Sequence, residues 1–119
     1  MARILVIDDQ LAIRVVLKRL LTHAGHEVLD AFDGQDGMEI FRESPTDMVV
    51  TDIQMPRKGG LDVILELRRD FPEVKIIALT AYGFGPLTRA TETGAHHAFM
   101  KPFSTVELLR VVQELLGTP

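Results

Sequence analysis

Residues 5–10 read LVIDDQ, an apolar run that ends abruptly in the adjacent carboxylates of Asp8 and Asp9. Ile4 extends the run backward, and the segment has the composition of a buried strand. Two like charges side by side repel each other, and each resists transfer out of water. Taken alone, such a pair indicates only a solvated turn, so its meaning depends on what the rest of the chain brings beside it.

Further runs of the same kind recur along the chain, and we predict that each is a strand. The five runs are Arg3–Ile7, Glu27–Ala31, Met48–Thr51, Val74–Leu79 and Ala95–Met100. They are short and mostly apolar throughout, which is typical of a parallel sheet covered on both faces.

Segments with helical periodicity separate these runs. They are Leu11–Ala24, Gln35–Arg42, Leu61–Phe71, Pro86–Thr93 and a last segment that follows Ser104. The last segment has the clearest boundaries, because Ser104 and Glu107 fit a capping box and Gly117 closes it. Gly25 supplies a similar stop for the first helix.

Strand and helix therefore alternate five times, which predicts an α/β doubly wound sheet. A length of 119 residues and five units favour a single flavodoxin-like (βα)5 three-layer domain over residues 1–119, with parallel strands in the order 2-1-3-4-5. A six-stranded Rossmann sheet fits less well, and a (β/α)8 barrel would need about twice the length.

The composition excludes several function classes. The chain has no cysteine, which excludes disulfides and thiolate metal sites. Its net charge is −4 and its Lys and Arg residues are scattered, which argues against nucleic-acid binding by this domain. No apolar run approaches the roughly 20 residues that span a bilayer, and no signal peptide is visible, so we expect a cytoplasmic protein with no membrane contact.

Polar side chains stand at the carboxyl ends of four predicted strands. Asp8 and Asp9 follow the first strand, Asp52 the third, Thr80 the fourth and Lys101 the fifth. Ligands of a doubly wound sheet bind outside these ends, at the point where the strand order reverses. We therefore expect three carboxylates, one hydroxyl and one ammonium group to meet in one shallow pocket.

The chemistry of this set points to a metal ion and a phosphoryl group. Three neighbouring acids need a cation, and oxygen ligands in an open, wet site suit Mg²⁺ or Mn²⁺. Positive charge from the metal and Lys101 above a carboxylate suits a phosphoryl group. Asp52 lies centrally and is the best candidate for a nucleophile that forms an acyl phosphate, with Thr80 as a hydrogen-bond donor.

Taken together and in order, these residues resemble the receiver domain of two-component response regulators. The resemblance covers essentially the whole chain, and the motifs that carry it are Asp8-Asp9, Asp52-x-x-Met55-Pro56, Gly60, Thr80-Ala81, and Gly94-Ala95 leading to Lys101-Pro102-Phe103.

The resemblance implies a role for each site residue. Asp52 would be the phosphoacceptor, Asp9 the direct metal ligand and Asp8 a ligand through water, with the backbone carbonyl of Gln54 completing the set. Thr80 would be the switch hydroxyl that moves toward the phosphoryl group. Lys101 would pair with that group, and the bond that joins it to the following proline is usually cis in the family.

The resemblance also implies partners. A sensor histidine kinase or a phosphotransfer protein would donate the phosphoryl group, and a downstream effector protein or domain would read the switch. A dimer that forms on phosphorylation is compatible with this reading. The domain would be a signalling module and not an enzyme, apart from catalysing its own phosphotransfer and dephosphorylation.

The chain departs from the family pattern at the position three residues before the lysine. Receivers often carry Tyr or Phe there, and this chain has Ala98. Phe99 is adjacent, but strand alternation places it on the opposite face. Gly83, Gly85 and Pro86, the last expected at the first helical position, should shorten or loosen the fourth helix. We therefore expect an output surface that is mobile or works differently.

Other function classes fit the chain less well. An aspartate-dependent phosphatase typically has a second Asp two residues after its nucleophile, and Gln54 cannot act as that general acid. A flavin-binding carrier needs a phosphate loop where Asp8 and Asp9 stand. An inert interaction module would lack the acids or the lysine. A role for Asp9 as a helix cap stays open, as does membership of a longer chain.

The sequence also indicates the surroundings of two further groups of side chains. His23 and His26 flank a turn and are expected to be solvated. Tyr82, Phe84 and Phe103 either form an exposed apolar patch for a partner or pack locally.

Overall fold

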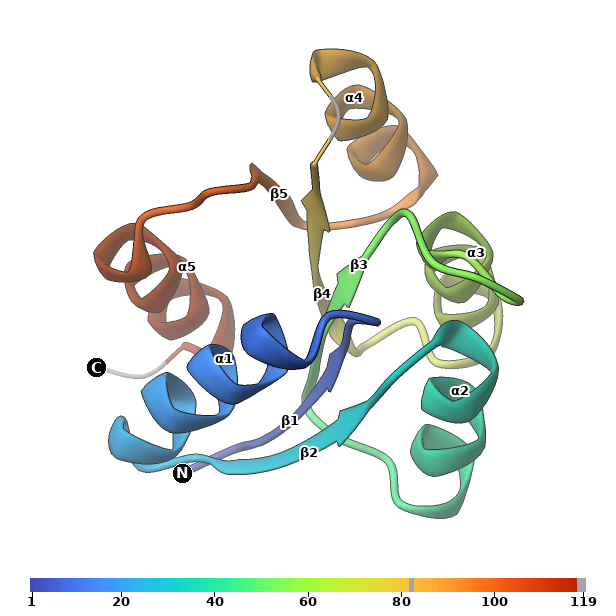
Figure 1. Ribbon diagram of the computed structural model, residues 1–119. Coiled ribbons are helices and arrows are strands. Elements are labelled where there is room, and N and C mark those ends of the chain that lie inside the picture. Colours follow the sequence, from blue (N-terminus) through green and yellow to red (C-terminus); the bar gives the residue numbers. More distant parts are fainter. Residues whose placement is uncertain (82, 118–119) are drawn as a thin grey trace.

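The computed structural model describes residues 1–81 and 83–117, so the expectation for Tyr82 lies outside the described residues. Five parallel strands form one sheet in the order β2-β1-β3-β4-β5, as predicted (Figure 1). The strands are β1 (Arg3–Ile7), β2 (Glu27–Ala31), β3 (Met48–Asp52), β4 (Lys75–Thr80) and β5 (His97–Met100).

Helices cover both faces of the sheet (Figure 1). The helices are α1 (Leu11–His23), α2 (Gly34–Glu43), α3 (Gly60–Asp70), α4 (Phe84–Thr93) and α5 (Thr105–Leu116). One core cluster joins Ile4 and Val6 to residues of α1 and α5. A second cluster joins Leu5 and Ile7 to residues of α2 and α3, because successive strand side chains point to opposite faces.

The predicted stops of the first and last helices are confirmed. Ser104 precedes α5 and its side chain accepts a hydrogen bond from the Glu107 N–H at 3.2 Å. Gly117 follows α5 with a φ of 68°, and Gly25 lies just beyond α1 with a φ of 97°. Glycine adopts such backbone angles at no steric cost, so both residues end their helices for the predicted reason.

The expectation that α4 begins at Pro86 is wrong, whereas its expected loosening stays a prediction. The helix has 10 residues, the same number as α2, and Pro86 is its third residue and not its first. The first turn of a helix has no intrahelical partners for its N–H groups, so a proline there removes no hydrogen bond. Gly83 precedes the helix with a φ of 62°, a conformation that turns the chain sharply into α4.

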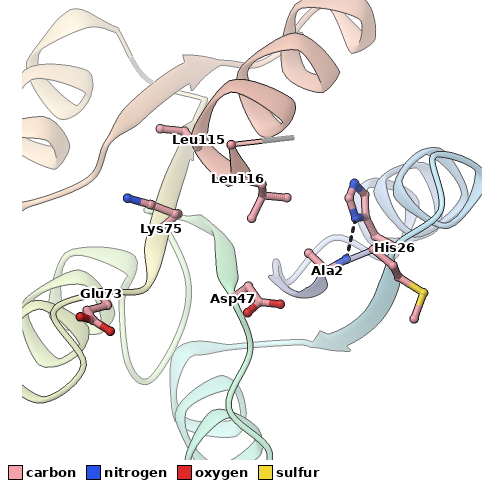
Figure 2. Close-up of a pocket in the computed structure, with 9 residues that line it drawn as sticks. Ala2, His26, Asp47, Glu73, Lys75, Leu115 and Leu116 are labelled. Atoms are coloured by element: carbon pink, nitrogen blue, oxygen red, sulfur yellow. Dashed lines mark hydrogen bonds between the residues drawn. The ribbon is translucent and has the colours of Figure 1, made fainter. Parts of the chain in front are cut away.

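The amino ends of the strands surround a hollow of about 420 Å³ (Figure 2). Its lining residues are Met1, Ala2, His26, Asp47, Glu73, Lys75, Leu115, Leu116 and Gly117. Two polar side chains here hold the residues at the start of β1. The Ala2 N–H donates to His26 Nδ1 at 3.2 Å, and the Arg3 N–H donates to Asp47 Oδ2 at 2.8 Å. At this edge of the sheet, side chains therefore satisfy backbone N–H groups at the start of β1.

The expectation that His26 is solvated is wrong. Its side chain is buried, whereas His23 is exposed as expected. Burial lowers the pKa of His26, which favours the neutral imidazole that can accept the Ala2 N–H. The contact between Ala2 and His26 joins residues 24 positions apart, so local sequence patterns do not predict it.

Phe84 and Phe103 have different surroundings. Phe84 is 76% exposed on α4, whereas Phe103 packs partly against the core cluster of α1 and α5. The Phe103 ring lies 6.4 Å from the ring of Phe99. Phe103 therefore packs locally, and it does not share an exposed patch with Phe84.

The glycine at the start of α3 lies where no larger residue fits. A Cβ atom on Gly60 would lie 2.1 Å from the Asp52 carbonyl oxygen and 2.7 Å from the Ile53 Cα. Both contacts are with backbone, so Gly60→Ala is expected to lower the free energy of unfolding by about 2–3 kcal/mol. Urea unfolding measures this change.

Gly85 provides the matched control, because a Cβ there meets nothing within 4 Å. Gly85→Ala is expected to change the free energy of unfolding by less than about 1 kcal/mol, because the higher helix propensity of alanine is opposed by the restriction that Pro86 places on the residue before it. Equal effects of the two substitutions would contradict the proposed clash with the backbone that follows β3.

Among the described residues, none of the helices has both the length and the apolar character needed to cross a membrane.

Candidate functional site

Four strand ends bring the predicted site residues to one edge of the sheet. Asp8 directly follows β1, Asp52 ends β3, Thr80 ends β4 and Lys101 directly follows β5. The strands run parallel and in register, with Asp52 opposite Leu79 and Thr80 opposite Met100. The carboxyl ends of the four strands therefore meet, as the sequence predicts.

The three acids form one cluster. Asp8, Asp9 and Asp52 each present a carboxylate oxygen, and these oxygens all lie within 4.8 Å of one another. Asp8 and Asp52 are buried, and Asp9 is exposed. Such close carboxylates repel one another, so a positive charge is needed nearby.

Lys101 supplies part of that charge. Its Nζ donates to Asp8 Oδ2 at 2.9 Å and lies 3.6 Å from Asp52 Oδ2. It also donates to Gln10 Oε1 at 3.0 Å, a contact that the sequence did not predict. The ammonium group is thus held between two acids by three oxygens.

The contacts at the start of α1 test the alternative in which Asp9 caps this helix. Asp8 Oδ1 accepts a hydrogen bond from the Gln10 N–H at 2.9 Å, and the Asp8 carbonyl accepts one from Arg14 at 2.8 Å. Gln10 is the N-cap residue of α1 and makes no side-chain cap. The alternative in which Asp9 caps this helix is therefore wrong, and its exposed carboxylate faces the cluster instead.

Asp52 is the most perturbed acid of the cluster. Burial, followed by the charge of Asp8, raises the pKa of Asp52 to about 6, although Lys101 opposes the change. Its Oδ1 is buried and has no hydrogen-bond partner among the described residues. A buried carboxylate oxygen without a partner is unusual, and a bound cation or an incoming electrophile would satisfy it.

Thr80 is fully buried, and a neighbour that the sequence did not predict holds its hydroxyl. The hydroxyl donates to Gln54 Oε1 at 3.1 Å, and the Ala81 N–H donates to the same oxygen at 3.4 Å. The resemblance implied a metal-binding role for the Gln54 backbone and an influence of this position on the lifetime of an acyl phosphate, but no contact with Thr80. A side-chain contact between residues 26 positions apart leaves no trace in local patterns.

The departure from the family pattern at Ala98 is confirmed. Ala98 packs against the core cluster of α2 and α3, and Phe99 against the opposite cluster of α1 and α5. No aromatic ring of β5 therefore lies beside Ala98 on its face of the sheet. The peptide bond between Lys101 and Pro102 is cis, as the resemblance implies.

The acid cluster fits a divalent cation. It combines three carboxylates, one of them exposed, with a buried Asp52 oxygen that lacks a partner among the described residues. Hard oxygen ligands in a site open to water are those that Mg²⁺ prefers. Asp8, Asp9 and Asp52 could hold such an ion.

The raised pKa of Asp52 makes the stability of the metal-free protein depend on pH. Folding raises the pKa from 3.8 to about 6, so the folded state binds the proton more tightly than the unfolded state. The free energy of unfolding is therefore expected to fall by about 2–3 kcal/mol as the pH rises from 4 to 7. Urea unfolding in EDTA measures this change.

Asp52→Asn is the control, because other groups also titrate in this range. The neutral imidazole of His26 adds stability with rising pH in both proteins, so the difference between the two curves isolates Asp52. Saturating Mg²⁺ should remove most of the difference. Parallel curves in EDTA would contradict the raised pKa.

Comparisons with known proteins agree with this geometry. The model of the family described as "Response regulator receiver domain" matches residues 4–113. The chemotaxis protein CheY of Thermotoga maritima is 33% identical over 115 residues, which cover 95% of this chain and 96% of that protein. A solved response regulator receiver domain protein from Clostridium thermocellum has a TM-score of 0.91 and 33% identity, covering 98% of this chain and 95% of that one.

Longer proteins are also similar to this chain. A probable transcriptional regulator ycf27 of Cyanophora paradoxa is 38% identical over 96% of this chain and 48% of its own length. The chain spans about half the length of the ycf27 relatives that it matches.

Proposed function

The chain belongs to the response regulator receiver domain family, and from this premise we propose that Asp52 accepts a phosphoryl group in a Mg²⁺-dependent reaction. The observation that carries the proposal is the buried Oδ1 of Asp52. It has no hydrogen-bond partner among the described residues, and the carboxylate that carries it belongs to the acid cluster, with its other oxygen 3.6 Å from Lys101 Nζ. A carboxylate oxygen with available lone pairs is a nucleophile that needs no separate base.

In the proposed reaction, an Asp52 carboxylate oxygen attacks the phosphorus atom of the donor. The new bond joins this oxygen to phosphorus, and the bond from phosphorus to the leaving group breaks with its electron pair. Lys101, held beside Asp52, would stabilise the negative charge of the phosphoryl oxygens. Thr80 would then donate its hydroxyl to one of these oxygens.

Asp8, Asp9, Asp52 and the Gln54 backbone carbonyl would hold Mg²⁺, with Mn²⁺ as a substitute. The bound ion would neutralise charge on the transferred group. Asp9 is the exposed member and suits direct ligation, whereas Asp8 is already bound to Lys101 and Gln10, which suits a ligand that acts through water.

We further propose that residues 1–119 are one receiver domain that works in the cytoplasm with a sensor histidine kinase or phosphotransfer protein as donor. A downstream effector protein or domain would read the phosphorylated state. The similarity to a transcriptional regulator and to a chemotaxis protein supports both kinds of output. The domain would act as a stoichiometric acceptor and not as an enzyme for other substrates.

A direct measurement tests the proposed function. The protein is incubated with Mg²⁺ and acetyl phosphate, a small acyl-phosphate donor, and its intact mass is recorded. We expect a gain of one phosphoryl group, which EDTA suppresses and hydroxylamine removes, because an acyl phosphate is labile to this nucleophile. A stable mass gain that EDTA leaves unchanged would contradict the proposal.

A further inference from the structure

The side chain of Gln54 lies between the proposed phosphoacceptor and the end of β4. Gln54 stands two residues after Asp52 and is half-buried. The Ile53 N–H donates to the Leu79 carbonyl at 2.8 Å, which extends the pairing of β3 and β4 beyond Asp52. This pairing holds the backbone before Gln54 against β4, and the amide reaches across to the end of that strand.

The orientation of the Gln54 amide follows from its partners. The Ala81 backbone N–H can only donate, so the atom that faces it at 3.4 Å must be the amide oxygen. The Thr80 hydroxyl, 3.1 Å from the same oxygen, must then donate its proton to it. One oxygen therefore receives both a side-chain and a backbone donor from the end of β4.

The Thr80 hydroxyl cannot serve two acceptors at once. A hydroxyl carries a single proton, and in this structure that proton is directed to Gln54. A phosphoryl oxygen on Asp52 would need the same proton. The two hydrogen bonds are therefore mutually exclusive.

From this geometry we propose that the Gln54 side chain is a positioning residue that holds the Thr80 hydroxyl and the Ala81 backbone in the resting state until a phosphoryl group displaces it. The proposal rests on the proposed function, since it assigns the resting partner of the group that would bind the phosphoryl oxygen. The contact of Gln54 with Thr80 and Ala81 would couple Asp52 to the start of the connection between β4 and α4. This coupling needs no aromatic ring at position 98, where the chain has Ala98.

The resting half of the proposal is tested by a double-mutant cycle on the unphosphorylated, metal-free protein. Gln54→Met removes the strong acceptor at similar length, and Thr80→Val removes the hydroxyl at similar shape. We expect a coupling factor of about five in the equilibrium constant of urea unfolding, the value of one neutral hydrogen bond. Additive effects of the two substitutions would overturn the proposal.

The switching half is tested with trifluoroberyllate, a stable phosphoryl analogue, in the presence of Mg²⁺. If Gln54 competes for the hydroxyl, Gln54→Met should tighten trifluoroberyllate binding about fivefold. The same substitution in the Thr80→Val background should change the affinity less than twofold, because no hydroxyl remains to release. An equal change in both backgrounds, or none in either, would overturn the proposal.

Two comparisons keep this test separate from that of the proposed function. Gln35→Met alters an exposed glutamine of α2 whose side-chain amide donates to Glu39, outside the acid cluster, and it should leave the affinity unchanged. If the wild-type protein fails to bind trifluoroberyllate, the proposed function fails, and the unfolding cycle alone then decides whether Gln54 holds Thr80.

Discussion

Asp52→Asn is expected to abolish phosphoryl incorporation from acetyl phosphate. Removal of a nucleophile lowers a reaction rate by about 100-fold or more. The amide keeps the shape of the carboxylate but lacks its charge and its nucleophilic oxygen. Asp8 cannot substitute, because it is fully buried and bound to Lys101 and Gln10. Intact-mass measurement with Mg²⁺ present gives the result directly.

Asp62→Asn is the matched control for this experiment. Asp62 is an exposed acid in the first turn of α3, outside the acid cluster. This variant should incorporate the phosphoryl group as the wild type does. Retained labelling in Asp52→Asn, mapped to another acid, would remove the nucleophile assignment while leaving the fold and the metal site intact.

Lys101→Met is expected to lower the free energy of unfolding of the metal-free protein by about 3–5 kcal/mol near pH 7, as for a buried ion pair that loses one partner. The side chain of Lys101 is only 11% exposed and that of Asp8 is fully buried. Methionine preserves the length of the side chain but leaves Asp8 and Asp52 facing each other without the ammonium group. Urea unfolding in EDTA measures the loss.

Mg²⁺ separates this electrostatic account from a packing defect. A bound cation replaces the missing charge, so Mg²⁺ should bind Lys101→Met more tightly than the wild type, whose ammonium group repels the ion, and at equal Mg²⁺ concentration it should stabilise the variant more. Lys18→Met is the control: its ammonium group is half exposed and 3.4 Å from Asp30, so its loss should change stability by at most about 1 kcal/mol. A Lys101→Met protein that Mg²⁺ stabilises no more than the wild type would contradict the account.

Much of the fold was predictable because the strands have an unambiguous composition. The bounds predicted for β1 and β2 are those observed, and β3 extends one residue further to include Asp52. The fifth strand begins at His97 and not at Ala95, since Ala95 donates its N–H to Ala90 and lies in the turn that closes α4. Apolar composition alone does not distinguish a helix exit from the strand that follows.

The site was predictable to the extent that topology determines it. Once the strand order is known, residues at four strand ends must converge, and no side-chain detail is needed to place Asp8, Asp52 and Lys101 together. The two glutamines were not predictable as partners. Gln10 and Gln54 contact Lys101 and Thr80 through amide rotamers, which depend on packing that exists only after the sheet has formed.

The ion pair between Lys101 and Asp8 joins residues 93 positions apart in the chain. The first acids leave the ribosome early, whereas the amine that neutralises them is among the last residues of the domain to emerge. A nascent chain that lacks β5 therefore exposes uncompensated carboxylates and cannot close the pocket. The carboxylates of the acid cluster therefore gain their lysine partner only after almost the whole domain has been synthesised.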